Sequence, residues 1–241
     1  MSGHSKWNNI KHKKEKADAA KAKIFTKIGK EMAVAIKAGG PDPNNNSKLR
    51  DLIAKAKANN VPNDNIQRTI KKFTDNGDIN FEEIVYEGYG PSGVAIIVET
   101  STDNRNRTAG NVRAAFSKYG GNLGQNGCVG YLFEEKGVIT IVDEDEEIEE
   151  DKIMEDALEC GAEDIKSDDG EYSIYTDPAD LDSVRDAIIA LGYKINTADL
   201  AKVPSTYVEL TSEEDIANME KMLDKFDEDD DVIAVYHNWD M

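Results

Sequence analysis

Cations alternate with aromatic and amide side chains near the start of the chain. The segment Lys6–Lys14 carries one tryptophan and two asparagines among lysines and a histidine. Lysine neutralises phosphate charge, and an indole ring can stack on a nucleobase. The segment therefore predicts a nucleic-acid contact, made by Lys6, Trp7, Asn8, Asn9, Lys11, His12, Lys13 and Lys14. The alternative for Trp7 is a packing anchor within a helical bundle.

A second polar cluster follows a predicted strand and consists of Asn104, Arg105, Asn106 and Arg107. Arginine and asparagine present several hydrogen-bond donors, which suits contacts to phosphate and to base edges. The alternative is a helix cap with internal hydrogen bonds, made by Thr102, Asp103 or Asn104. A loop of this kind has few packing neighbours, so the loss of its arginines should impair function more than stability.

The remaining motifs predict no catalytic, cofactor or metal site. Gly88–Gly93 matches GxGxxG but precedes a predicted strand, which favours a hairpin turn over a dinucleotide site. The acidic runs Asp143–Asp151 and Asp227–Asp231 lack the glycine and glutamate positions of a calcium-binding EF-hand loop. The histidines are scattered, and Cys128 and Cys160 are not close in sequence. We therefore expect a binding protein rather than an enzyme, with no small-molecule substrate.

Charge divides the 241 residues unevenly. Residues 1–80 hold 17 lysines and arginines against 8 aspartates and glutamates, a net charge of +9. Residues 81–241 hold 12 against 40, a net charge of -28. The basic part is attracted to a polyanion and the acidic part is repelled by it. This asymmetry predicts that residues 1–80 carry most of the affinity for nucleic acid.

The apolar pattern of residues 1–80 has the period of helices. Apolar residues recur at three- and four-residue steps from Ala17 to Ile36, and a stripe of lysines on the same helix could meet phosphate together: Lys16, Lys23, Lys27 and Lys30. Gly39–Pro41 should end this helix, and Asn44–Ser47 offers caps for a second. A third helix carries Arg68, Lys71 and Lys72 on its outer face, and the last two helices resemble a helix-turn-helix.

Strands and helices alternate beyond residue 80. The predicted elements of residues 134–203 follow the order β-α-β-β-α-β of a ferredoxin-like unit, with its last strand at Tyr193–Asn196. Strand Thr206–Leu210 and the following helix and strand should complete a second such unit begun by residues 93–133, including a strand at Val129–Phe133. The glycine-rich segment Gly120–Gly127 within it is either a tip that approaches a partner or a flexible loop.

The predicted fold class is accordingly α+β. It comprises a basic helical domain of residues 1–80, a discontinuous α/β domain of residues 81–133 and 204–241, and a ferredoxin-like α/β domain of residues 134–203 inserted into it.

Several motifs together resemble the YebC-type family. They are the opening Met1–Trp7 with its Asn-Ile-Lys-His-Lys-Lys continuation, the turn Glu87–Pro91, and Thr102–Thr108. The resemblance implies a three-domain α/β protein with a helical N-terminal domain, of the kind described as probable DNA-binding transcriptional regulators. Mitochondrial relatives, including the translational activator of cytochrome c oxidase, act in translation, and bacterial members have been tied to the ribosome. It also implies that Lys6–Lys30 and Asn104–Thr108 contact nucleic acid.

Two functions are therefore expected as alternatives. The first is a DNA-binding transcriptional regulator, and the second is a ribosome-associated translation factor that binds ribosomal RNA. The start of the chain carries neither a presequence nor a long apolar segment, so we expect a cytoplasmic protein without a membrane partner, as a monomer.

Overall fold

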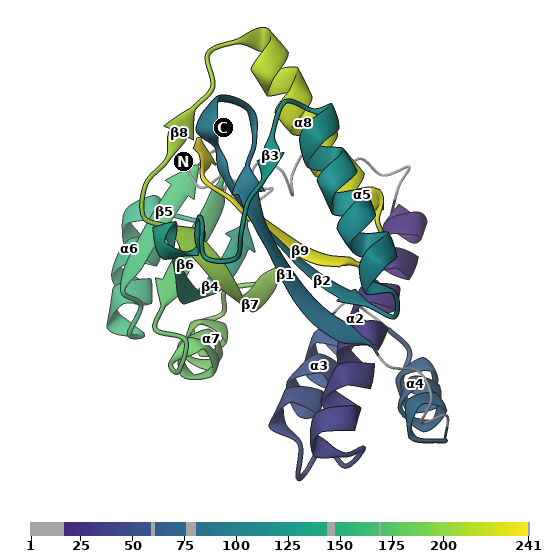
Figure 1. Ribbon diagram of the computed structural model, residues 1–241. Coiled ribbons are helices and arrows are strands. Elements are labelled where there is room, and N and C mark those ends of the chain that lie inside the picture. Colours follow the sequence, from purple (N-terminus) through teal and green to yellow (C-terminus); the bar gives the residue numbers. More distant parts are fainter. Residues whose placement is uncertain (1–16, 59–60, 76–80, 144–147, 169, 241) are drawn as a thin grey trace. The chain divides into compact units, whose positions relative to one another are not determined.

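The computed structural model describes residues 17–58, 61–75, 81–143, 148–168 and 170–240, with the side chains of residues 17–23 and 58 excepted. The chain forms two compact units (Figure 1). Within the described residues, one unit holds residues 17–130 and 211–235, and the other holds residues 131–210 and 236–240. The chain combines helices with two four-stranded sheets, which confirms the predicted α+β class. Within the described residues, no helix combines the length and apolar character needed to cross a bilayer.

Three helices form the N-terminal part of the first unit: α2 (Ala17–Gly39), α3 (Ser47–Ala58) and α4 (Asn63–Asp75). They bury a common apolar core that includes Ile28, Met32, Leu49 and Ile66. Asn46 is buried between the first two helices. Its side-chain amide donates to the carbonyls of Ala35 and Gly40, and its side-chain oxygen accepts the amide of Leu49. The predicted caps and helix end between residues 39 and 47 are thereby confirmed.

A four-stranded sheet forms the rest of the first unit. It consists of β1 (Glu82–Tyr89), β2 (Ala95–Thr102), β3 (Asn122–Leu123) and β9 (Val232–His237), in the order β3-β1-β2-β9. Helices α5 (Arg105–Lys118) and α8 (Glu213–Glu228) lie side by side, with the rings of Phe116 and Phe226 5.4 Å apart (Figure 1). Because β1 lies between β2 and β3, helix α5 connects two strands that are not neighbours, as in a split β-α-β unit.

The segment that matches GxGxxG forms the connection between β1 and β2. The two strands pair antiparallel from Glu82 opposite Thr102 to Tyr89 opposite Ala95. A short 3-10 turn, Pro91–Gly93, joins them, and the Gly90 amide donates to the Val94 carbonyl. The segment is therefore a hairpin connection, as predicted, and no helix begins there to hold a pyrophosphate.

The second unit contains its own four-stranded sheet. Its elements are β4 (Phe133–Val142), α6 (Glu150–Glu159), β5 (Asp164–Asp168), β6 (Glu171–Thr176), α7 (Leu181–Ala190) and β7 (Thr197–Pro204). The strand order β5-β6-β4-β7 with antiparallel pairing is the ferredoxin-like arrangement that the element order predicted. Ile139, Ile153, Ile174 and Val184 belong to its buried core. A separate parallel pair joins β8 (Val208–Glu209) to β10 (Trp239–Asp240).

Three predicted strands are wrong. Residues 130–132 form a 3-10 turn, and the strand begins only at Phe133. The strand expected at Tyr193–Asn196 starts instead at Thr197, where pairing with β4 begins opposite Thr140. The strand expected at Thr206–Leu210 shrinks to β8, which pairs with β10 and not with the first sheet.

The chain leaves the first sheet after β3 and returns to it with β9, and the strands of the second sheet lie between these two points in sequence. The detailed three-domain boundaries at residues 80, 133 and 203 stay a prediction.

Candidate nucleic-acid interface

Many of the predicted contact residues lie outside the part of the chain that the structure describes. This group comprises Lys6, Trp7, Asn8, Asn9, Lys11, His12, Lys13, Lys14 and Lys16. Lys23 belongs to α2, but its side chain is also outside the described set. The predicted contacts that the structure does place fall on α2, α4 and the start of α5.

The outer face of α4 is basic and exposed. Ile66 is buried against the helical core, and Ile70 and Phe73 pack partly buried against it. Ile66, Ile70 and Phe73 are spaced four and three residues apart, so they share one face of the helix. Arg68, Lys71 and Lys72 lie between them in sequence and face the solvent. Among the described residues, Arg68 and Lys71 form no ion pair, and the Lys72 ammonium lies 5.5 Å from the Phe73 ring. Within the described part of the chain, the three cations therefore have no anionic partner.

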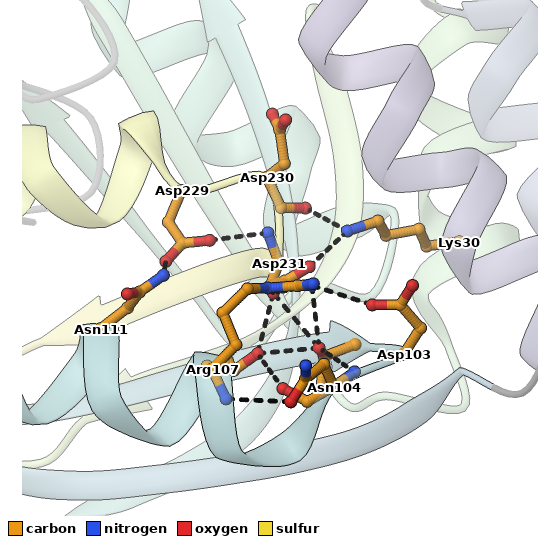
Figure 2. A network of polar contacts seen from close by, with 10 residues as sticks. Lys30, Asp103, Asn104, Arg107, Asn111, Asp229, Asp230 and Asp231 are labelled. Atoms are coloured by element: carbon orange, nitrogen blue, oxygen red, sulfur yellow. Dashed lines mark hydrogen bonds and ion pairs between the residues drawn. The ribbon is translucent and has the colours of Figure 1, made fainter.

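Arg107 has a different environment, which Figure 2 shows. Asn104 caps α5, with its side-chain oxygen accepting the Arg107 amide at 3.1 Å. The Arg107 guanidinium donates to Asp231 from Nε at 3.2 Å and from Nη2 at 2.7 Å, and it also donates to Asp103 at 2.9 Å. The expectation that the loop has few neighbours is therefore wrong at Arg107, which is bound by two carboxylates. Its main partner lies 124 residues away along the chain, so no local pattern indicates it.

Asp231 is the centre of this network (Figure 2). Its side chain is only 4% exposed, and it accepts from Lys30 at 2.7 Å and from the Thr108 hydroxyl at 2.8 Å. Burial raises the pKa of Asp231, but the hydrogen bonds from Lys30, Arg107 and Thr108 outweigh burial and lower that pKa to about 2. The carboxylate is therefore charged in the folded protein, and it joins α2 to the sheet of the same unit.

The lysine stripe of α2 also turns toward acidic groups. Besides its bond to Asp231, the Lys30 ammonium donates to the Asp230 carbonyl at 2.9 Å. Lys27 lies 3.7 Å from Asp227, and both lysine side chains are about 15% exposed. A nucleic-acid contact by Lys27 or Lys30 stays a prediction, and it would require these pairs to open.

A cavity of about 560 Å³ adjoins the Asp231 network. It lies along α5 and the junction between α8 and β9, and the charged side chains that line it are Lys30, Asp103, Arg107, Lys118, Lys225, Glu228, Asp229, Asp230 and Asp231. Carboxylates slightly outnumber cations in this set. The cavity is therefore poorly suited to an anionic ligand such as a phosphate.

Sequence reasoning assigned no role to Glu87, which is buried. One carboxylate oxygen accepts the amide of Gly127 at 2.8 Å, and the other accepts those of Val129 and Gly130 at 2.9 and 2.7 Å. Because the amides of Val129 and Gly130 are bound by a side chain, they do not donate to a neighbouring strand, and residues 130–132 form a 3-10 turn. A glutamate in a strand beside glycines, followed by a glycine-rich loop, is the only local signal.

We predict that Glu87→Gln loosens this loop. A glutamine side chain keeps one acceptor oxygen and replaces the other with an NH₂ donor. At least one backbone amide would then face a donor and lose its hydrogen bond, at a cost of about 1–3 kcal/mol. Amide hydrogen exchange at Gly127, Val129 and Gly130 should accelerate. Glu82→Gln changes an exposed side chain of the same strand and should leave exchange unaltered. Unchanged exchange in the Glu87 variant would show that the carboxylate does not hold the loop.

Comparison with known proteins agrees with the fold and the sequence motifs. Residues 5–76 match the model of the TACO1/YebC protein N-terminal domain, and residues 81–239 match that of the TACO1/YebC second and third domain. A probable transcriptional regulatory protein of Agathobacter rectalis is 57% identical over the full length of both chains. One from Lachnoclostridium phytofermentans is 54% identical, again over both full lengths.

A solved structure is similar throughout. The crystal structure of a conserved hypothetical protein from Aquifex aeolicus is 43% identical, with a TM-score of 0.86, and the match covers 98% of this chain and 97% of that one. Since the family models together span nearly all of the sequence and the identity extends over complete chains, this protein belongs to the TACO1/YebC family.

Proposed function

We propose that this protein is a nucleic-acid-binding regulator of gene expression, and more specifically a DNA-binding transcriptional regulator. The observation that carries the proposal is the exposed basic face of α4, where Arg68, Lys71 and Lys72 have no acidic partner among the described residues. This face belongs to the segment of net charge +9, whereas the rest of the chain has a net charge of -28. Phosphate neutralisation gives such a surface its affinity.

Three further points support this proposal. The relatives from Agathobacter and Lachnoclostridium are named probable transcriptional regulatory proteins. The charge asymmetry directs the helical part toward a polyanion and the acidic part away from it. The polar groups of the Asp231 network are satisfied by one another, which is typical of a structural role and not of a reaction centre. The protein would accordingly act by binding, without catalysis, in the cytoplasm.

Crosslinking in cells followed by sequencing of the bound nucleic acid tests the proposal. The expected result is enrichment of a limited set of DNA segments that lie upstream of genes. Crosslinks concentrated in ribosomal RNA would indicate that the protein regulates translation and not transcription. The basic face is compatible with either target, because DNA and RNA both carry phosphate charge. A crosslinked fraction with no nucleic acid above that of an unrelated acidic protein would overturn the proposal altogether.

A further inference from the structure

Helix α5 has an unusual charge for its position in the chain. It carries four basic residues and no acidic one. It belongs to residues 81–241, which contain 40 aspartates and glutamates but only 12 lysines and arginines. A segment rich in carboxylates attracts cations, and several cations of residues 81–241 are bound by neighbouring carboxylates. Lys136, Lys152, Arg185 and Lys225 all form ion pairs.

The four cations of α5 do not share one role. Arg107 is bound by Asp231 and Asp103. The Lys118 ammonium lies 5.2 Å from the Tyr119 ring and lines the cavity with Arg107. Arg105 and Arg113 are exposed, and neither has an ion pair within the described part of the chain. These two arginines are thus available to an external partner.

The surface around Arg113 is small and polar. Asn106, Gly110, Arg113 and Ser117 recur at steps of four, three and four residues, so they share one face of α5, and all four are exposed. Among the described residues, no atom lies within 4 Å of the position of a Cβ on Gly110, so a partner backbone can approach closely there. An amide, a hydroxyl and a guanidinium along an unobstructed helix suit a phosphodiester chain, to which most protein–DNA hydrogen bonds are made.

The charges of Arg105 and Arg113 both act on the buried hydroxyl of Tyr86. Burial raises the pKa of Tyr86 on β1, whereas the charges of Arg105 and Arg113 lower it. Arg105 lies in the first turn of α5, eight residues before Arg113, and it is likewise exposed.

We propose that this face, together with Arg105, is a second contact for the phosphate backbone of the nucleic acid, in addition to α4. The inference rests on the proposed function and deepens it, because it assigns Arg113 to binding and Arg107 to structure. Arginine suits the role because its guanidinium stays charged and forms paired hydrogen bonds with phosphate oxygens. This face also gives residues 81–241 a local attraction to phosphate. That attraction offsets the repulsion between nucleic acid and the net negative charge of these residues.

The test compares two full-length double variants with the unmodified protein. Arg105→Gln with Arg113→Gln removes the two proposed contacts, and Lys194→Gln with Lys221→Gln removes two other exposed cations without described ion-pair partners. Binding of a labelled mixed-sequence duplex and of the matching RNA strand is measured by fluorescence anisotropy between about 50 and 200 mM salt. Thermal melting establishes that each variant is folded.

The arginine variant should lose about 1.8 in the slope of log K against log salt on duplex, or about 1.4 on a single strand, and the lysine variant should lose almost none. Equal slopes for the two variants, with normal binding by the unmodified protein, would overturn this inference and leave the proposed function standing. Failure of the unmodified protein to bind either nucleic acid would remove both.

Discussion

Replacing Asp231 with alanine should lower the free energy of unfolding by about 3 kcal/mol, because it removes the acceptor shared by a buried charge network. Lys30 and Arg107 would lose their common partner, and the Thr108 hydroxyl would lose an acceptor. The largest part of the cost should come from Lys30, because its side chain is only 14% exposed and its charge would lose its carboxylate partner. Chemical denaturation followed by circular dichroism measures the change.

Asp230→Ala is the matched control for this prediction. Asp230 is the adjacent residue, it is exposed, and it accepts from Lys30 through its backbone carbonyl, which the substitution retains. Its loss should change stability by no more than about 0.5 kcal/mol. Similar destabilisation by the two substitutions would show that the general acidity of the turn matters, and not the carboxylate of Asp231.

The contribution of Asp231 should also depend on pH in a defined direction. Its pKa in the folded protein is about 2, below the ordinary value of 3.8. The folded state therefore favours the charged form, and the resulting stability, about 2 kcal/mol, is present above pH 3.8 and is lost as the pH falls toward 2. The stability difference between the unmodified protein and Asp231→Asn should shrink over that interval. A constant difference would indicate that hydrogen-bond geometry alone accounts for the effect.

Changing Arg68, Lys71 and Lys72 together to glutamine should give the largest loss of nucleic-acid binding. If each residue neutralises one phosphate, the slope of log K against log salt falls by about 2.7 on duplex. At about 0.1 M salt this corresponds to a roughly 500-fold weaker affinity. Helicity should be retained, because glutamine, lysine and arginine have similar helix propensities.

A charge-conserving variant provides the control for the α4 prediction. Arg68→Lys with Lys71→Arg and Lys72→Arg retains three cations on the same face, so the salt slope should stay unchanged. If the glutamine variant also keeps the original slope while remaining helical, then the face of α4 does not meet phosphate. Binding would then be assigned to Lys6–Lys14, which precedes the described residues.

The amino-acid sequence determined the local elements of this protein and its charge distribution. The three- and four-residue periodicity placed the helices of the N-terminal domain, because each helix must present one apolar stripe to a common core. The order of strands and helices was enough to predict the ferredoxin-like sheet of β4 to β7, since few topologies satisfy that order. The motifs near Trp7, Gly88 and Arg105 indicated the family, which the full-length matches then confirmed.

The tertiary structure alone decided which charged residues are available for binding. Arg107 and Arg113 are only six residues apart on one helix, yet Asp231 binds the first, and the second forms no ion pair with a described residue. Lys30 meets Asp231 across 201 residues of sequence, and Glu87 holds amides about 40 residues further along. Periodicity reports which face of an element is buried, but it carries no information on which distant element lies opposite. The pairing of charges depends on that neighbour, so it follows only from the folded chain.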